Sequence, residues 1–342
     1  MTATETTLGN NIRPGRHRRR GGGGKMVSSR GRRLLIMPVV LAITAVFGGA
    51  ATAAATPAAA TYHEYVALGD SWSADVNLFD ITSQYVPFGC VQSAADYPHQ
   101  VAATLGISTF RDATCGGATT VNMTAPQSAP LGGTNPPQFN QLTPSTDLVT
   151  LGIGGNDVGL VGVVESCVNL LPTITLVPGL NLPAPLGGSC QPQYVSGGVD
   201  KVSVEIKAAA PKIAAAIAGI KARSPHARIE LVNYMNPMPT AGCYPYVQIA
   251  DEDMPWLHDK IAEMDTMLAT VAATAHVGLV NTNTGMAGHD VCQLPGNQYV
   301  TALLPISTDP LIAVPFHPTQ LGANHQAAIV LKTLAGASSN RS

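Results

Sequence analysis

The fold is decided by two stretches, YHEYVALGDSW at residues 62–72 and DLVTLGIGGND at residues 147–157. Each is a short β-rich run that passes directly into glycine and then into polar side chains. Runs of this kind, bounded by glycine and polar residues, are typical of strands. RIELVNY at residues 228–234 and HVGLVN at residues 276–281 have the same character. The sequence therefore predicts strands at Tyr62–Leu68, Asp147–Ile153, Arg228–Tyr234 and His276–Asn281.

Helical patterns lie between and after these strands. They cover Asp96–Leu105, the alanine-rich Ser203–Ala222, Asp253–Ala273 and Thr319–Leu334. Strands that alternate with helices form βαβ units, whose strands run parallel and whose right-handed crossovers place helices on the sheet. We therefore expect an α/β protein, a three-layer α/β/α sandwich with a mainly parallel central sheet, formed by one domain over residues 62–342.

The first 61 residues are expected to be a signal peptide and flexible N-terminus rather than part of the fold. Nine Lys and Arg residues lie between residues 13 and 33, and the apolar run Leu34–Phe47 and a tract rich in alanine and threonine follow. This order of basic, apolar and small residues is that of a secretory signal. The apolar run is shorter than the ~20 residues of a membrane span, so an uncleaved anchor is the less favoured alternative and no stable membrane insertion is expected. Translation from Met26 and twin-arginine export through Arg32-Arg33 are both compatible with the sequence.

Removal of this segment leaves an acidic protein. Nine of 19 Lys and Arg residues precede Tyr62, but only one of 21 Asp and Glu residues does. The remainder therefore contains ten basic and 20 acidic residues. Nucleic acids and anionic membrane surfaces bind to a positive footprint, which this composition lacks. We therefore expect no nucleic-acid partner.

Six cysteines, all beyond residue 61, indicate disulfides in an exported protein. No Cys-x-x-Cys pair is present, so the spacing of a zinc ribbon is absent. Six cysteines allow about 15 pairings. The sequential pairing closes the shortest loops and is the one we expect, namely Cys90–Cys115, Cys167–Cys190 and Cys243–Cys292.

Polar blocks collect at the predicted carboxyl ends of the strands, where ligands bind in open α/β sheets. Gly69-Asp70-Ser71-Trp72 follows the first strand and Gly154-Gly155-Asn156-Asp157 follows the second. CGGATT at residues 115–120 lies between them, and Phe316-His317-Pro318 precedes the last helix. A serine, a glycine, an asparagine and a histidine thus fall where one pocket forms.

The four blocks, in this order, resemble the GDSL/SGNH hydrolase family, and the resemblance extends from Tyr65 to about Ala328. The cysteines, the secretion signal and the CGGATT stretch are similar to those of its secreted actinobacterial esterases, lipases and phospholipases. The resemblance implies a flavodoxin-like fold and carboxylic ester hydrolysis, with no cofactor and no metal. We expect a monomer, secreted to the medium or the cell wall, that acts on a small-molecule or lipid ester.

The residue types suit this chemistry. A serine hydroxyl becomes an effective nucleophile when a neighbouring base takes its proton, and Ser71 is the expected nucleophile with His317 as its base. The resemblance implies an oxyanion hole formed by the N–H groups of Ser71 and Gly117 and the side-chain amide of Asn156. Pro318 is expected at the first position of the last helix. Each residue also has a plainer explanation as a cap, a turn or a structural histidine, and the four blocks together favour the catalytic one.

The sequence departs from the family at the residue that orients the histidine. The common pattern is Asp-x-x-His-Pro, but Val314 stands three residues before His317. The imidazole is then oriented by a main-chain carbonyl, from Val314 or Pro315, or by Asp309. We expect a Ser–His dyad oriented by main chain, with Asp309, in an Asp-Pro turn, as the alternative.

Residues 168–195 carry prolines and glycines among apolar side chains and are bracketed by Cys167 and Cys190. We expect a stapled apolar loop near the site, whose rim favours a fatty-acyl chain; a plain surface insertion is the alternative. The rim residues are Leu170, Leu171, Ile174, Leu176, Val177 and Leu180. The sequence leaves open whether the ester belongs to a lipid, a phospholipid, an acetylated sugar or the cell wall.

Two other classes of function are less favoured. A two-metal phosphoesterase could use Asp70, Asp75, Asp157 and His317, but the Asp-x-His and Gly-His-x-His ligand pairs of that class are absent. A binding protein on an old hydrolase fold is conceivable because a fold does not determine function. The intact serine, glycine, asparagine and histidine argue against it.

Overall fold

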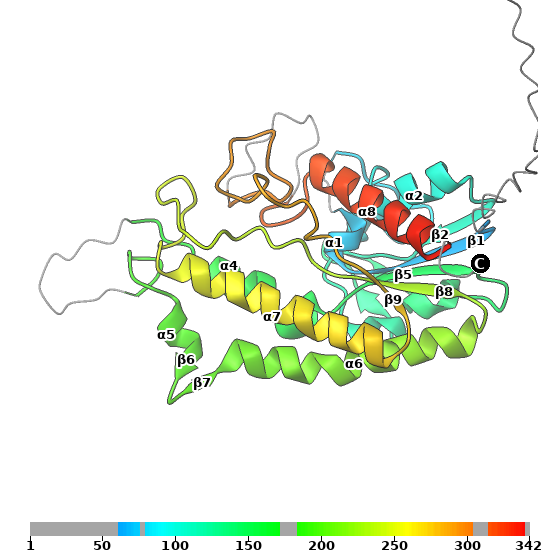
Figure 1. Cartoon of the computed structure of the whole chain (residues 1–342), viewed down its shortest axis with the longest axis horizontal. Coiled ribbons are helices and arrows are strands. Elements are labelled where there is room, and N and C mark those ends of the chain that lie inside the picture. Colours follow the sequence, from blue (N-terminus) through cyan, green and yellow to red (C-terminus); the bar gives the residue numbers. More distant parts are fainter. Residues whose placement is uncertain (1–60, 76–78, 172–182, 304–313, 339–342) are drawn as a thin grey trace, which may run out of the picture. The chain divides into compact units, whose positions relative to one another are not determined.

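The computed structural model describes residues 61–75, 79–171, 183–303 and 314–338. Its central sheet consists of parallel strands in the order β2-β1-β5-β8-β9 (Figure 1). These strands are β1 (Glu64–Gly69), β2 (Thr109–Asp112), β5 (Leu148–Gly152), β8 (Arg228–Val232) and β9 (Gly278–Val280). The order places β1 beside β5, with Gly69 aligned on Gly152. The loops that carry the serine block and the asparagine block therefore leave the sheet next to each other.

Helices cover both faces of this sheet (Figure 1). One face carries α6 (Lys201–Arg223) and α7 (Asp253–Thr274), and the other carries α2 (Tyr97–Leu105) and α8 (Gln320–Ser338). Side chains alternate along β1: Val66 and Leu68 join the core under α6 and α7, whereas Tyr65 and Ala67 join the core under α2 and α8. All four are fully buried, as parallel strands covered on both faces require. The three-layer α/β/α sandwich is confirmed.

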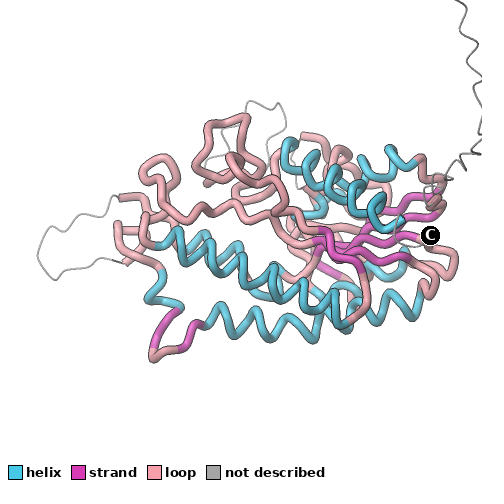
Figure 2. The backbone as a smooth tube through the Cα atoms, viewed as in Figure 1, coloured by secondary structure: helices cyan, strands magenta, loops and turns pink. Residues whose placement is uncertain are grey.

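Shorter elements lie in the connections (Figure 2). The short α-helices are α1 (Ser71–Ala74), α3 (Gly155–Val158), α4 (Leu160–Ser166) and α5 (Gln191–Tyr194). The 3-10 turns are η1 (Phe88–Cys90), η2 (Thr120–Met123) and η3 (Gln138–Gln141), and the two-residue strands are β3 (Gln127–Ser128), β4 (Thr134–Asn135), β6 (Val195–Ser196) and β7 (Val199–Asp200). α1 and α3 begin at the carboxyl ends of β1 and β5, so each polar block opens a helical turn.

The start of α8 differs from the prediction. Pro318 does not open the helix but forms an isolated bridge with Val300, and the helix begins at Gln320. Thr319 caps it, because its Oγ1 accepts a hydrogen bond from the N–H of Gly322 at 3.1 Å. The helix thus begins two residues after Pro318 and one residue after the start of the predicted range.

The six cysteines form the disulfides Cys90–Cys115, Cys167–Cys190 and Cys243–Cys292, which is the sequential arrangement. Within the described ranges, no helix has both the length and the apolar character to cross a membrane. The expected signal peptide falls on residues 1–60, which lie outside the described part of the chain.

Candidate active site

Ser71 is the first residue of α1 and lies at the carboxyl end of β1. The helix cap is Asp70 rather than Ser71, because the Asp70 carboxylate accepts a hydrogen bond from the N–H of Trp72 at 3.0 Å. Ser71 is 6% exposed, and its Oγ lies 2.8 Å from Nε2 of His317. The serine hydroxyl is therefore free of the capping role and is directed at an imidazole.

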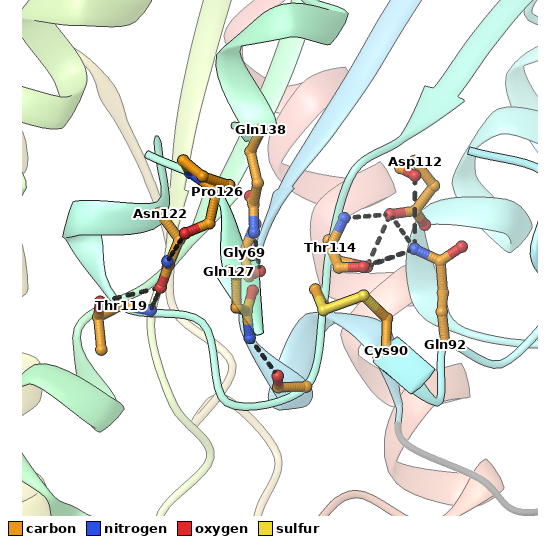
Figure 3. The surroundings of a disulfide bond; sticks show 12 residues. Gly69, Cys90, Gln92, Asp112, Thr114, Thr119, Asn122, Pro126, Gln127 and Gln138 are labelled. Carbon is orange, nitrogen blue, oxygen red and sulfur yellow. Dashed lines mark hydrogen bonds between the residues drawn. A yellow bond between two sulfur atoms is a disulfide. The ribbon is translucent and has the colours of Figure 1, made fainter. Parts of the chain in front are cut away.

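The end of β1 is held tightly in place. A Cβ on Gly69 would lie 2.6 Å from the backbone oxygen of Gly152 and 2.5 Å from the Oγ of Ser73, so this position does not accept a side chain. The buried amide of Gln138 bonds to both main-chain groups of Gly69, donating to its oxygen at 2.8 Å and accepting from its N–H at 2.9 Å (Figure 3). These contacts fix the turn from which Ser71 projects.

His317 approaches Ser71 from the segment before α8 and is 7% exposed. Its Nδ1 lies 2.8 Å from the main-chain oxygen of Pro315. A carbonyl oxygen only accepts, so Nδ1 carries the proton and Nε2 presents its lone pair to Ser71. Burial lowers the pKa of His317 to about 4, and the bond to Pro315 opposes part of that fall. The imidazole is therefore neutral at pH 7.

The Pro315 carbonyl is the group that lies against Nδ1 of His317. The Val314 carbonyl instead accepts the backbone N–H of His317 at 3.1 Å. Asp309 lies outside the described residues.

Gly117 follows two residues that are held by several contacts, among them the disulfide of Cys90 that Figure 3 shows. The Cys90–Cys115 disulfide ties the start of the loop to η1. The N–H of Gly116 donates to the oxygen of Cys90 at 3.0 Å, and Nε2 of Gln127 donates to the oxygen of Gly116 at 2.6 Å. Gly117 has a φ of 74°, in the left-handed region that glycine adopts readily. Gly117 is thus an exposed residue of a loop whose two preceding residues are held by these bonds.

Asn156 and Asp157 join α3 to this same loop. Nδ2 of Asn156 donates to the oxygen of Ala118 at 2.9 Å, which leaves its second amide hydrogen for another acceptor. The Asp157 carboxylate accepts from the N–H of Thr120 at 2.9 Å and from its hydroxyl at 2.6 Å. Asp157 therefore has a structural role that the sequence did not indicate.

The structure places the three predicted oxyanion donors as follows. No acceptor among the described residues bonds the N–H of Ser71 or that of Gly117. Ser71 and Asn156 line one pocket, whereas Gly117 lies outside its lining, one residue before the Ala118 carbonyl that Asn156 bonds.

The pocket beside Ser71 is narrow and apolar. It leaves about 510 Å³ of space between atoms, part of it open to solvent. Its apolar walls come from α4, from the segment after β8 and from α7, and they include Leu160, Val161, Val164, Met235, Met238 and Ile261. Such walls suit a hydrocarbon chain.

Sequence reasoning missed Tyr234, which lines the pocket and whose hydroxyl donates to Asp70 at 2.5 Å. Burial raises the pKa of Asp70 to about 7, while the hydrogen bonds from Tyr234 and Trp72 lower it. The sequence did contain a signal for Tyr234. This residue ends the predicted strand Arg228–Tyr234, and the carboxyl ends of the strands are where the other candidate site residues lie.

The predicted apolar rim is only partly described by the structure. Leu170 and Leu171 of the predicted apolar rim are exposed, and Ile174, Leu176, Val177 and Leu180 lie outside the described residues.

Groups of three or more potential metal ligands, within the described ranges, are Cys167 with Cys190 and Asp253, and Asp96 with His99 and Asp112. Neither group contains the residues that a two-metal phosphoesterase would use.

Comparison with known proteins gives one consistent result. The model of the GDSL-like lipase/acylhydrolase family matches residues 67–324. Lipase 2 of Streptomyces coelicolor is 30% identical over 275 residues, which cover 79% of this chain and 85% of that protein. Two solved structures share the fold. An extracellular lipase from Streptomyces rimosus has a TM-score of 0.61 at 22% identity, covering 79% of this chain and 99% of its own. Phospholipase A1 from Streptomyces albidoflavus NA297 has a TM-score of 0.58 at 20% identity, covering 80% and 99%.

Proposed function

The chain belongs to the GDSL-like lipase/acylhydrolase family and is a carboxylic ester hydrolase, and on that premise we propose that it is a secreted enzyme that cleaves acyl esters of lipids through a Ser71–His317 dyad. The observation that carries this proposal is the 2.8 Å contact between Oγ of Ser71 and Nε2 of His317 beside an apolar pocket.

The dyad works as a nucleophile and its base. Nε2 of His317 takes the proton of Ser71 as Oγ attacks the ester carbonyl, and the Pro315 carbonyl keeps hold of Nδ1–H throughout. The imidazolium then protonates the leaving alcohol. Water, activated by the same nitrogen, releases the acyl group from Ser71 and restores the enzyme.

The oxyanion is stabilised by donors that are in place before the reaction. We assign this role to the N–H groups of Ser71 and Gly117 and to the Asn156 amide. The two N–H groups have no acceptor among the described residues, and the amide has a hydrogen to spare, which supports the assignment. Removal of one such donor typically lowers kcat by about 10²–10³, which is the loss we expect for Asn156→Ala.

The acyl chain lies in the pocket between α4 and α7. The wall residues Leu160, Val164 and Ile261 contribute apolar surface. An acyl chain that packs against them is removed from water, which favours its binding. That Lipase 2 of Streptomyces coelicolor is similar over most of its length supports a lipid ester as substrate.

Secretion is supported by the disulfides and by the basic, apolar and small-residue order of residues 1–61. The mature enzyme then begins near residue 62. N-terminal sequencing of protein recovered from culture medium tests both the export and the cleavage site.

The test of the dyad is Ser71→Ala. We expect ester hydrolysis and labelling by a serine-directed phosphonate to disappear in a protein that stays folded. The matched control is Ser93→Ala, which removes a buried hydroxyl whose role is to accept from the N–H of Ala95. Activity of folded Ser71→Ala within about tenfold of wild type refutes the assignment, because loss of a nucleophile costs far more.

The test of the substrate is a series of p-nitrophenyl esters of increasing chain length. We expect medium or long chains to give higher kcat/KM than acetate, since each methylene buried in the pocket contributes ~0.8 kcal/mol. If acetate is the best substrate, the lipid assignment is wrong and a carbohydrate deacetylase fits better.

A further inference from the structure

Tyr234 follows β8 by two residues, and its main chain is held from both sides. Its N–H donates to Oδ1 of Asp265 on α7 at 3.1 Å, and its carbonyl accepts from Nδ2 of Asn283 at 3.1 Å. Asn283 also donates to Oδ2 of Asp265 at 2.6 Å, which closes a ring of hydrogen bonds. The Cα of Tyr234 is therefore fixed by elements outside the catalytic loops.

The phenolic oxygen of Tyr234 bonds both loops of the site at once. It donates to Oδ2 of Asp70 at 2.5 Å and accepts from the N–H of Gly155 at 2.8 Å. Asp70 is the residue before Ser71, and Gly155 is the residue before Asn156. A phenol has one hydrogen to donate, so the donor is fully used.

These bonds lie in an enclosed part of the site. Tyr234 is 5% exposed and Asp70 is 1% exposed. A Cβ on Gly155 would lie 3.1 Å from the Tyr234 ring, which shows how closely the loop rests on the phenol. The Trp72 ring meets the Tyr234 ring edge-on, with centroids 5.5 Å apart. Water has little access to replace either bond.

We propose that Tyr234 is a positioning residue that sets the separation between the nucleophile turn and the Asn156 loop, an inference that rests on the proposed function. Oxyanion donors are effective when their positions are fixed before charge develops. The Ser71 N–H and the Asn156 amide sit on different loops, and the phenol ties together the residues that precede them. Tyr234 thus acts on the oxyanion through these loops, not by direct contact.

Tyr234→Phe removes both hydrogen bonds and keeps the ring. Since misplacement of a donor weakens only the transition state, we expect kcat on a soluble short-chain ester to fall about 10–100-fold while KM changes less than about twofold. The rate at which a phosphonate inactivates Ser71 should fall by a similar factor, because the tetrahedral adduct places an oxygen in the same hole.

The matched control is Tyr65→Phe. Tyr65 is also fully buried, and its hydroxyl lies 2.7 Å from Oγ1 of Thr150 within the sheet, away from both loops. Loss of this hydroxyl should lower the melting temperature as Tyr234→Phe does but leave kcat within about twofold of wild type. If the two variants lose kcat alike, the loss reflects stability and the positioning role is overturned.

Asp70→Asn provides a second variant. The two oxygens of Asp70 accept one bond each, from Trp72 and from Tyr234. An amide has a single oxygen, so one of these two bonds is lost. Its kcat should fall, and the loss in the double variant with Tyr234→Phe should be smaller than the product of the two single losses, since the Asp70–Tyr234 bond can be lost only once. Additive losses contradict a common tie.

The Ser71→Ala and Tyr234→Phe variants test the dyad and the positioning role separately. If Ser71→Ala is inactive but Tyr234→Phe keeps wild-type kcat and phosphonate reactivity, only the positioning role is wrong. If folded Ser71→Ala remains active, the dyad itself is wrong.

Discussion

Folding stability should depend on pH in a way that reports the buried state of His317. Burial lowers its pKa to about 4 in the folded protein, whereas an unfolded chain has a histidine pKa of about 6.5. Between these values the unfolded chain binds a proton that the folded protein does not, so falling pH favours unfolding. The contribution of His317 is fully present above about pH 6.5, falls as the pH falls, and levels off below about pH 4.

The size of the effect follows from the difference in pKa. About 2.5 units at 1.36 kcal/mol each correspond to about 3 kcal/mol of unfolding free energy. Burial raises the pKa of Asp70 and of Asp265 to about 7, and their contributions have the opposite sign because the folded protein then holds the extra proton. The quantity to measure is therefore the difference between wild type and His317→Gln, in which these carboxyl groups cancel.

Urea unfolding of both proteins at about pH 7.5 and about pH 4 gives that difference. We expect the unfolding free energy of wild type, relative to that of His317→Gln, to be about 3 kcal/mol lower at about pH 4 than at about pH 7.5. A difference that stays constant within about 0.5 kcal/mol would mean that the imidazole keeps an ordinary pKa and is not enclosed as the structure has it.

Further expected outcomes concern the base, the disulfides and the pocket. His317→Ala should lose nearly all esterase activity while Asp309→Asn keeps most of it; a fall of about 10⁴ in kcat for folded Asp309→Asn would make this aspartate a third catalytic member. Peptide mapping without reduction should recover the three sequential cysteine pairs, and loss of Cys90–Cys115 should lower the unfolding free energy by about 2–4 kcal/mol; any crossed pair contradicts this. Val164→Phe, which narrows the pocket, should lower kcat/KM for long-chain esters at least about tenfold more than for acetate; an equal loss places the acyl chain elsewhere.

The strands that the sequence predicted are those whose surroundings leave a strong pattern. β5 lies inside the predicted range Asp147–Ile153, because a strand buried on both faces is apolar at nearly every position. β2 was missed because its four residues, TFRD, lie at the edge of the sheet and only Asp112 is fully buried. A short edge strand with partly exposed polar side chains has no such pattern.

Some residues of the candidate site can be recognised from their type in the sequence, and others only from their contacts in the folded chain. Ser71 and His317 were selected because a nucleophile and its base require particular residue types, and the structure places Oγ of Ser71 2.8 Å from Nε2 of His317. The partner of Nδ1 was left open between carbonyls and Asp309, because every residue has a carbonyl and composition cannot mark the one that is used. Tyr234 was missed since its role depends on which loops meet at its hydroxyl, and that is a property of the folded chain.

Orientation by a carbonyl changes what holds the His317 imidazole in place. The turn that carries His317 is fixed by its own main chain: the His317 N–H bonds to the Val314 oxygen, and Phe316 adopts a φ of 58°. Thr301 anchors the turn, with its N–H on the His317 oxygen at 3.0 Å and its hydroxyl on the Val314 oxygen at 2.9 Å. A buried carboxylate would stabilise the imidazolium more strongly, but it would need donors of its own to remain charged. With the Pro315 carbonyl, the accepting atom is part of the same turn as the imidazole, so orientation survives without another buried charge.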